Sequence, residues 1–283
     1  MSTMQQRLAE IEAKEKVPSG ERAKLLEASK GEASAEDLKD GNAAFAKKDY
    51  AAAMKKLKLA AEKCSASAQN NVGHMYGNGC GVAQNYAEAI KWYKLAAEQG
   101  LASAQYNLAN MYINGTGVVK DYAESAKWYK LAAAQGDSAA QYNLGLMYCK
   151  GHGVVQNFAE AMKWYKLAAA LGDSMAPGNL GGMYCRGEGV VQDYVEAMMW
   201  YKLAAERGNT VAHDNIGTMY AKGDGVERDF VRAHMWWSLG ASGGNELAAE
   251  HRDMIAAMMT PRQVAEARKM AREFQPQEFK NRD

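Results

Sequence analysis

Asparagine recurs in this sequence at a fixed spacing, and its amide side chain can both donate and accept hydrogen bonds. The five asparagines stand 36 residues apart, at Asn71, Asn107, Asn143, Asn179 and Asn215. A row of amides at equal intervals could bind the backbone of an extended peptide, one residue per repeat. A residue that recurs in every copy could equally be structural, with each amide tying its helix to a neighbouring backbone group. The pattern leaves both interpretations open.

Residues that often carry catalytic or metal chemistry are present, but their spacing does not favour such a role. The histidines and cysteines are His74, His152, His213, His234, His251, Cys64, Cys80, Cys149 and Cys185. They form no His-Glu-x-x-His or Cys-x-x-Cys motif. A Gly-x-Gly turn recurs in each repeat without the Gly-Lys-Ser/Thr of a phosphate-binding loop, which favours a structural turn. The sequence therefore predicts no catalytic residue, no metal site and no cofactor.

The elements that position these residues follow the same 36-residue period. Two aromatic positions recur without a slip: Tyr76, Tyr112, Tyr148, Tyr184 and Tyr220, and Trp92, Trp128, Trp164, Trp200 and Trp236. A fixed period over five copies indicates one supersecondary unit stacked repeatedly along an axis.

Each copy reads as a helix–turn–helix hairpin. In the third copy, apolar or small residues at helical spacing over 140–148 predict the first helix. The glycines of the turn that follows break it. Asn157 then predicts the N-cap of the second helix, with Glu160 completing a capping pair, and Gly172 ends this helix.

The aromatic stripes predict how the hairpins pack. A single hairpin cannot bury its own stripe, so we expect stacking to bury Trp164 and Tyr148 between neighbours, at roughly 1.5–3 kcal/mol per large side chain. A small residue at the position of Gly145 should let the two helices of a hairpin approach closely. We therefore expect mutation of Trp164 to alanine to cost roughly 3–5 kcal/mol.

The pattern A-x-x-x-L-G-x-M-Y-x-x-G-x-G-V-x-x-D-x-x-x-A-x-x-W-Y-x-x-A-A-x-x-G resembles the Sel-one-like repeat (SLR), a relative of the tetratricopeptide repeat (TPR). The resemblance covers five copies and implies an all-α fold, a right-handed superhelical α-solenoid of helix–turn–helix repeats. It also implies an adaptor or scaffold role in protein binding, as in signalling. Some secreted SLR proteins link each hairpin with a close pair of cysteines, and that pairing is absent here.

The resemblance also implies where a partner would bind, because the first helix of each hairpin lines the concave surface of TPR-like superhelices. Three positions on this helix differ from copy to copy and, at i, i+4 and i+7, share a face. The predicted partner-binding residues of this groove are Asn71, Tyr106, Asn107, Asn110, Tyr142, Asn143, Leu146, Asn179, Asp214 and Asn215. Tyrosine is enriched in binding hot spots, so Tyr106 and Tyr142 are expected to contribute most to affinity.

Segments outside the repeats are expected to cap the array. We expect residues 1–35 to be a charged N-terminal extension, formed by short helices or partly disordered, and 36–64 to be a TPR-like capping hairpin. Residues 65–244 hold the five repeats. Residues 245–283 are expected to form C-terminal capping helices and a polar tail, with the last helix starting at Thr260. A repeat array of this length is expected to form one elongated domain.

Composition favours a soluble protein without a strongly charged partner. The net charge of +1 over 283 residues creates no strong field for nucleic acid or a membrane surface. A band of lysines along the second helices is expected to be a solvated face. Because the sequence shows no secretory signal pattern and no apolar run of about 18 residues, we predict a cytoplasmic protein with no membrane span.

The leading functional prediction is therefore a non-enzymatic adaptor that binds a protein or an extended peptide in the concave groove, and not nucleic acid. One alternative is a hydrolase, since some secreted SLR proteins have been linked to hydrolysis of β-lactams, although no nucleophile–base pair is evident. The other is a structural protein that self-assembles through Met254, Met258 and Met259. The sequence allows oligomerisation but does not imply it.

Overall fold

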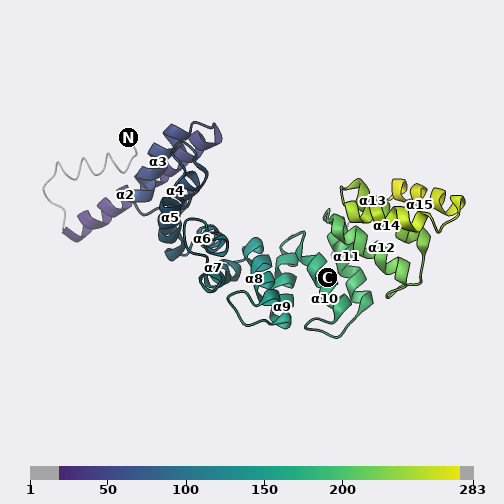
Figure 1. Cartoon of the computed structure of the whole chain (residues 1–283). Helices are drawn as coiled ribbons and strands as arrows, with labels where there is room; N and C mark the ends of the chain where they lie inside the picture. Colours follow the sequence, from purple (N-terminus) through teal and green to yellow (C-terminus); the bar gives the residue numbers. More distant parts are fainter. Residues whose placement is uncertain (1–18, 275–283) are drawn as a thin grey trace. The chain divides into compact units, whose positions relative to one another are not determined.

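The computed structural model describes residues 19–274, which form two compact units: unit 1 ends at Gln135 and unit 2 begins at Gly136. The regular secondary structure within these residues consists of α-helices alone (Figure 1). The all-α fold of helix–turn–helix repeats is thus confirmed. Each of the two units is described by itself. Hairpins of an array contact only their neighbours, so an array needs no core common to its full length.

Unit 1 contains three helical hairpins. Its helices are α2 (Ser19–Ala46), α3 (Tyr50–Glu62), α4 (Ala66–Asn78), α5 (Tyr86–Glu98), α6 (Ala102–Asn114) and α7 (Tyr122–Ala134). The expected boundary at residue 35 is not a break, because α2 runs through it without interruption. The part of the N-terminal prediction that concerns residues 1–18 lies outside the described residues.

Unit 2 contains three further repeats and a closing helix pair. Its helices are α8 (Ser138–Lys150), α9 (Phe158–Ala170), α10 (Ala176–Arg186), α11 (Tyr194–Glu206), α12 (Thr210–Lys222), α13 (Phe230–Ser242), α14 (Glu246–Ala256) and α15 (Pro261–Glu273). The start of α15 is as predicted, with a capping box between Thr260 and Gln263. Both closing helices pack on α13, and the Phe274 ring lies edge-on to Trp236 at 5.0 Å between ring centroids.

The Gly-x-Gly turns are structural, as their recurrence predicted. Gly187 ends α10 in the left-handed region (φ 67°), and its N–H donates to the Met183 carbonyl. Gly189 is also left-handed (φ 74°), and a Cβ atom there would lie 2.7 Å from the backbone carbonyl carbon of Phe158. Only glycine allows this close approach of the turn to the start of α9.

The predicted N-caps form, but the capping pair does not close. The Asn157 side chain accepts a hydrogen bond from the Glu160 N–H at 3.0 Å. The Glu160 carboxylate pairs with Lys163 at 3.3 Å instead of returning to the cap backbone. This correction has a simple cause, since a lysine three residues ahead on the helix offers the carboxylate a charged partner.

Replacing Asn157 with alanine should lower the free energy of unfolding by about 1 kcal/mol, because an N–H at the start of α9 loses its acceptor. Urea unfolding followed by circular dichroism measures this. The matched control is Glu160→Gln, which removes only an exposed ion pair and should cost less than about 0.5 kcal/mol. A larger loss from Glu160→Gln than from Asn157→Ala would contradict the assignment of the cap.

The core of the hairpin formed by α8 and α9 is centred on the tyrosine that follows the expected tryptophan. Tyr165 is 1% exposed, whereas Trp164 and Tyr148, which we expected to be hidden by stacking, are half-buried. The Tyr165 ring covers Gly145, where a Cβ atom would lie 2.7 Å from Cε1 of the ring. The prediction of close helix approach at Gly145 is therefore confirmed. Stacking hides Trp128, Trp236, Tyr184 and Tyr220, which are buried, but covers Trp164 and Tyr148 only in part.

Buried glutamines join successive hairpins in unit 1, a role that we did not predict. Gln69 and Gln105 each donate from Nε2 to the carbonyl of the eighth preceding residue at 3.1 Å, which ties a first helix to the end of the previous hairpin. In unit 2, Pro177 stands at the equivalent position and cannot donate. Arg207 supplies the bond instead, from Nη1 to the Ala169 carbonyl at 2.9 Å.

Candidate functional site

Four asparagine side chains form a directed row of hydrogen bonds in unit 1. The Nδ2 atom of Asn107 donates to Oδ1 of Asn70 at 3.0 Å, and Asn70 contacts Oδ1 of Asn71 at 3.5 Å. Asn71 in turn donates to Oδ1 of Asn42 at 2.8 Å. The row crosses from α6 through α4 to α2, so these amides join neighbouring first helices.

Two cavities open beside this row, and His74 lines both. The larger, about 420 Å³, is also lined by Phe45, whose ring meets that of His74 edge-on at 5.9 Å between centroids. The smaller, about 250 Å³, includes Asn107 and Asn110. Tyr106 lies close to the core instead, with its ring 5.8 Å from that of Tyr129. In each unit, we call the surface that the first helices of the hairpins form the first-helix face.

In unit 2 the predicted groove residues divide between packing and open surface. Tyr142 packs on Tyr165 with 5.8 Å between ring centroids, and Leu146 is half-buried against the core. Asn143 donates to the Ala139 carbonyl of its own helix at 3.0 Å. Asn143 therefore makes a bond within its own helix, not the tie to a neighbouring group that the structural interpretation of the asparagine row supposed.

Asp214, predicted to face a partner, is instead held by the closing helix. It is buried, and its Oδ1 atom lies 2.7 Å from Nδ1 of His251 on α14. The His251 ring also lies against Trp237, at 5.3 Å between ring centroids. The prediction for Asp214 is corrected for a physical reason: a buried carboxylate needs a partner, and the last repeat supplies it from within the chain.

Two of the side-chain hydrogen bonds between neighbouring hairpins share the same sequence separation. Asn107 reaches Asn70 and His251 reaches Asp214, and each pair is 37 residues apart. His251 follows Asn215 by 36 residues, so it continues the asparagine row into a degenerate sixth copy. Extending the period beyond Gly244 would have found this residue. These pairs favour a structural role for three positions of the row, Asn71, Asn107 and His251, each of which bonds the preceding hairpin.

Replacing His251 with alanine should lower the free energy of unfolding by roughly 1–3 kcal/mol, because Asp214 would stay buried without its partner. The matched control is His251→Ala combined with Asp214→Leu, which removes the stranded carboxylate and should recover much of the loss. Calorimetric melting of the three proteins tests this. A double variant no more stable than the single one would contradict the pairing.

A third cavity, about 220 Å³, opens on the first-helix face of unit 2. It is lined by Met175, Gly178, Asn179, Gly182, Arg186, Tyr201, Asn209, Val211, Ala212 and Asn215. The Asn179 amide lies near the Tyr142 hydroxyl, but its buried Nδ2 atom makes no well-formed hydrogen bond within 19–274. Asn179 and Asn215, both predicted to face a partner, thus line an open cavity in unit 2.

Burial favours the neutral form of several titratable groups near these surfaces. It raises the pKa of Tyr93, which lines the smaller cavity of unit 1, to about 12. It also raises the thiol pKa of Cys149 and Cys185 and lowers the pKa of His213. No group of three metal-ligating side chains occurs within the described part of the chain. Recognition at the two cavities of unit 1 can use hydrogen bonds and packing, and the third cavity adds the guanidinium of Arg186.

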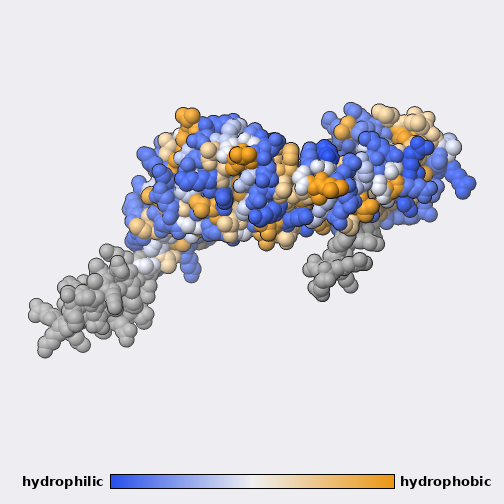
Figure 2. Space-filling model, turned by 90° about the horizontal axis from the view of Figure 1, so that it is seen from below, coloured by the Kyte–Doolittle hydropathy of each residue, from blue (hydrophilic) through white to orange (hydrophobic). Residues whose placement is uncertain are grey.

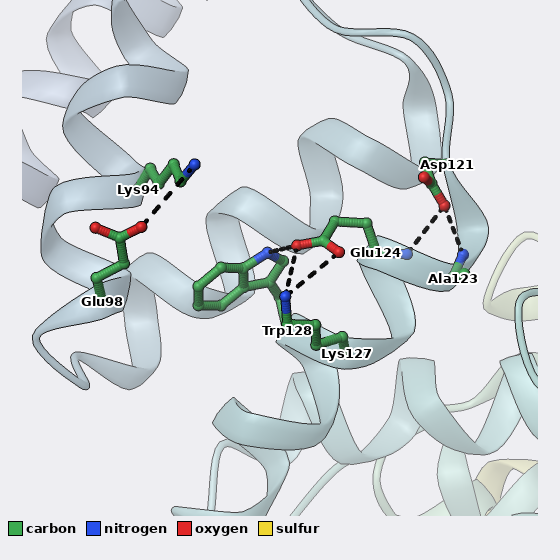
Figure 3. Close-up of polar contacts among 7 residues, drawn as sticks. All are labelled: Lys94, Glu98, Asp121, Ala123, Glu124, Lys127 and Trp128. Atoms are coloured by element: carbon green, nitrogen blue, oxygen red, sulfur yellow. Dashed lines mark hydrogen bonds and ion pairs between the residues drawn. The ribbon is translucent and has the colours of Figure 1, made fainter.

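Four lysines of the band on the second helices pair with acidic residues of the same helix: Lys91, Lys94, Lys127 and Lys163. Figure 3 shows Glu124 accepting hydrogen bonds from Lys127 (3.1 Å) and from the indole N–H of Trp128 (2.9 Å). On α5, the second helix of the repeat before the one that contains Glu124, Lys94 lies 3.9 Å from Glu98. On the face seen in Figure 2, hydrophobic residues form separate small patches among hydrophilic ones. This pairing agrees with a solvated face.

The repeated hairpins and their amide-lined face define an α-solenoid of helix–turn–helix repeats. The Sel1 repeat matches residues 66–101, 102–137, 138–173, 178–209 and 210–245, and the chain belongs to this family. Sel1 repeat proteins generally mediate protein–protein interactions. Across residues 19–274, no helix combines the length and apolar character that crossing a membrane requires.

Two solved structures support the assignment. The chain is 34% identical to c5321, a protective antigen of uropathogenic Escherichia coli with an SLR fold, with a TM-score of 0.77 over 88% of this chain and 56% of that one. The chain thus spans little more than half of that protein. It is 33% identical to a Sel1 repeat protein from Oxalobacter formigenes, with a TM-score of 0.73 over 85% of this chain and 98% of that one. No curated protein matches the chain.

Proposed function

We propose that the chain is a non-enzymatic adaptor that binds an extended protein segment along its first-helix face. The observation that carries this proposal is that the copy-to-copy variable positions of the first helices line open cavities in both units, at His74 and Asn110 in unit 1 and at Gly178 and Gly182 in unit 2. Amides and aromatic rings in such cavities suit a peptide, which offers a donor and an acceptor at every residue. The cytoplasm is the proposed location.

The pairing within the asparagine row changes which residues should contribute affinity. Asn71 and Asn107 already bond their neighbours, so their second amide hydrogens and free lone pairs are what a peptide would meet. Tyr106 and Tyr142 rest on buried tyrosines. We propose that this support holds their rings in place, which lowers the entropy lost on binding.

Replacing Tyr106 and Tyr142 together with alanine should weaken partner binding at least tenfold, about 1.4 kcal/mol. The partner is first captured from native lysate, identified, and then titrated as a purified protein. The control is the double Tyr→Phe variant, which keeps both rings on Tyr129 and Tyr165 and therefore keeps the fold. Unchanged affinity of a folded Tyr→Ala variant would contradict the proposed binding face.

Self-assembly remains a second proposal because one observation favours it. Met254 on the closing helix α14 and Met258 in the turn after it are 67% and 69% exposed, and Leu247 on α14 is 51% exposed. Met259 is half-buried against the core and is not available. Light scattering at several concentrations, on the wild type and a Met254→Gln/Met258→Gln variant, distinguishes assembly through this patch from none.

A further inference from the structure

The cavity on the first-helix face of unit 2 exists because two glycines replace large side chains. Gly178 and Gly182 occupy the positions held one repeat earlier by Tyr142 and Leu146. Both lie within α10 with φ angles that any residue can adopt. Glycine inside a helix costs roughly 0.5–1 kcal/mol relative to alanine, so neither glycine is explained by backbone conformation.

Packing explains the glycine between them but not these two. A Cβ atom at Gly181 would lie 2.6 Å from the ring of Tyr201, so that position must stay small. A Cβ at Gly182 would meet only the guanidinium of Arg186, at 3.0 Å, which is the far end of a flexible side chain. One at Gly178 would come closest to the Asn209 amide, at 3.1 Å. Gly182 therefore leaves space that the fold does not require, whereas a side chain at Gly178 would have to shift the Asn209 amide by a few tenths of an ångström.

The groups around this space are hydrogen-bond donors. Arg186 uses Nε and Nη2 for Glu188, both at 2.8 Å, which leaves Nη1 over Gly182 for another acceptor. Asn215 would bond the residue 37 positions earlier, but that residue is Gly178, so its amide has no partner among the described side chains. The buried Nδ2 atom of Asn179 lies near the Tyr142 and Tyr165 hydroxyls but makes no well-formed hydrogen bond among the described residues. The lining includes no carboxylate.

We propose that this cavity binds the carboxylate of an aspartate or glutamate side chain in the protein segment that the chain recognises. The inference rests on the proposed function and specifies its partner. A carboxylate offers up to four acceptor sites, which match the free hydrogens of Arg186, Asn179 and Asn215. A cavity of about 220 Å³ has room for such a side chain. Glu188 holds the same guanidinium from the other side and competes with the ligand.

The probe is a displayed library of random twelve-residue peptides selected on the full chain. Selected peptides are synthesised with an amidated C-terminus and titrated by calorimetry. We expect enrichment of Asp or Glu at one position, and a loss of about tenfold or more in affinity when that residue becomes Gln or Asn. An Arg186→Gln chain should show a similar loss and should no longer distinguish the acidic peptide from its amide form.

Two further variants act in opposite directions. Glu188→Gln frees Nε and Nη2 of Arg186 and should tighten binding of the acidic peptide. Gly178→Tyr with Gly182→Leu copies the preceding repeat into α10, fills the cavity, and should abolish this dependence on the acidic residue. Thermal melting checks folding, and the filled variant should melt no lower than the Arg186→Gln chain.

Each negative result of the peptide experiments contradicts a different part of the proposal. If peptides bind and depend on Tyr106 and Tyr142, but Arg186→Gln or the filled cavity changes nothing, the acidic site is wrong and the adaptor function stands. If affinity depends on a free C-terminus and not on an acidic side chain, the side-chain assignment is likewise overturned. If no peptide is selected, the proposed function fails and this inference with it.

Discussion

Replacing Tyr165 with alanine should lower the free energy of unfolding by roughly 3–5 kcal/mol, the range for removing a buried aromatic side chain. The ring is 1% exposed, covers Gly145 and supports Tyr142. Burial also raises the pKa of its hydroxyl well above the usual value, as expected for a phenol kept from water. Urea unfolding, followed by circular dichroism and by fluorescence, measures the loss.

The matched comparison is Trp164→Ala, one residue earlier on the same helix. Trp164 is half-buried, and its indole N–H is buried without a hydrogen-bond partner within 19–274. Its removal should therefore cost less than that of Tyr165, and less than the 3–5 kcal/mol that the repeat pattern suggested. An equal or larger loss for Trp164→Ala would contradict the assignment of the core to Tyr165.

Replacing Gly181 with leucine should destabilise the chain by about 3 kcal/mol, the upper end of the usual range for overpacking. The Cβ atom of the new side chain would lie 2.6 Å from the Tyr201 ring. That ring is itself only 5% exposed, so the residues packed around it leave no space into which it could shift. The helix preference of leucine offsets at most about 1 kcal/mol of this. The loss is measured by the midpoint of urea unfolding.

The neighbouring residue provides the control for this prediction. Gly182→Leu adds the same side chain on the same helix, but over the open cavity, so it should be neutral or stabilising by up to about 1 kcal/mol. Unit 1 shows how much the packed position tolerates: Ala109 stands at the position equivalent to Gly145, and Tyr129 is still 1% exposed. Similar losses for both glycine variants would contradict the packing described.

The sequence predicted what depends on local pattern. A fixed period, helix-breaking glycines and capping side chains such as Asn157 are set by residues close in the chain, so the hairpins and their turns could be placed without coordinates. The period also located the first-helix positions that line the cavities. The late start of α10 has a local cause as well, since Pro177 fits only the first turn of a helix.

What could not be predicted depends on which neighbour a side chain meets. The period shows that a tryptophan and a tyrosine recur together, but the relative burial of Trp164 and Tyr165 depends on which ring faces the small residue of the first helix. Asp214 looked like a groove residue because its partner, His251, lies past the last regular copy. The unfilled space at Gly178 appears only when the three adjoining helices are placed around it.

Site-specific photo-cross-linking tests directly whether a peptide binds on the first-helix face. A benzophenone side chain is placed on the first-helix face at His74 and at Thr218, one in each unit, and in matched controls at the exposed second-helix residues Lys91 and Lys163. With the selected peptide present, we expect peptide cross-links at one or both first-helix positions and none at the lysines. Cross-links confined to Lys91 or Lys163 would contradict this expectation.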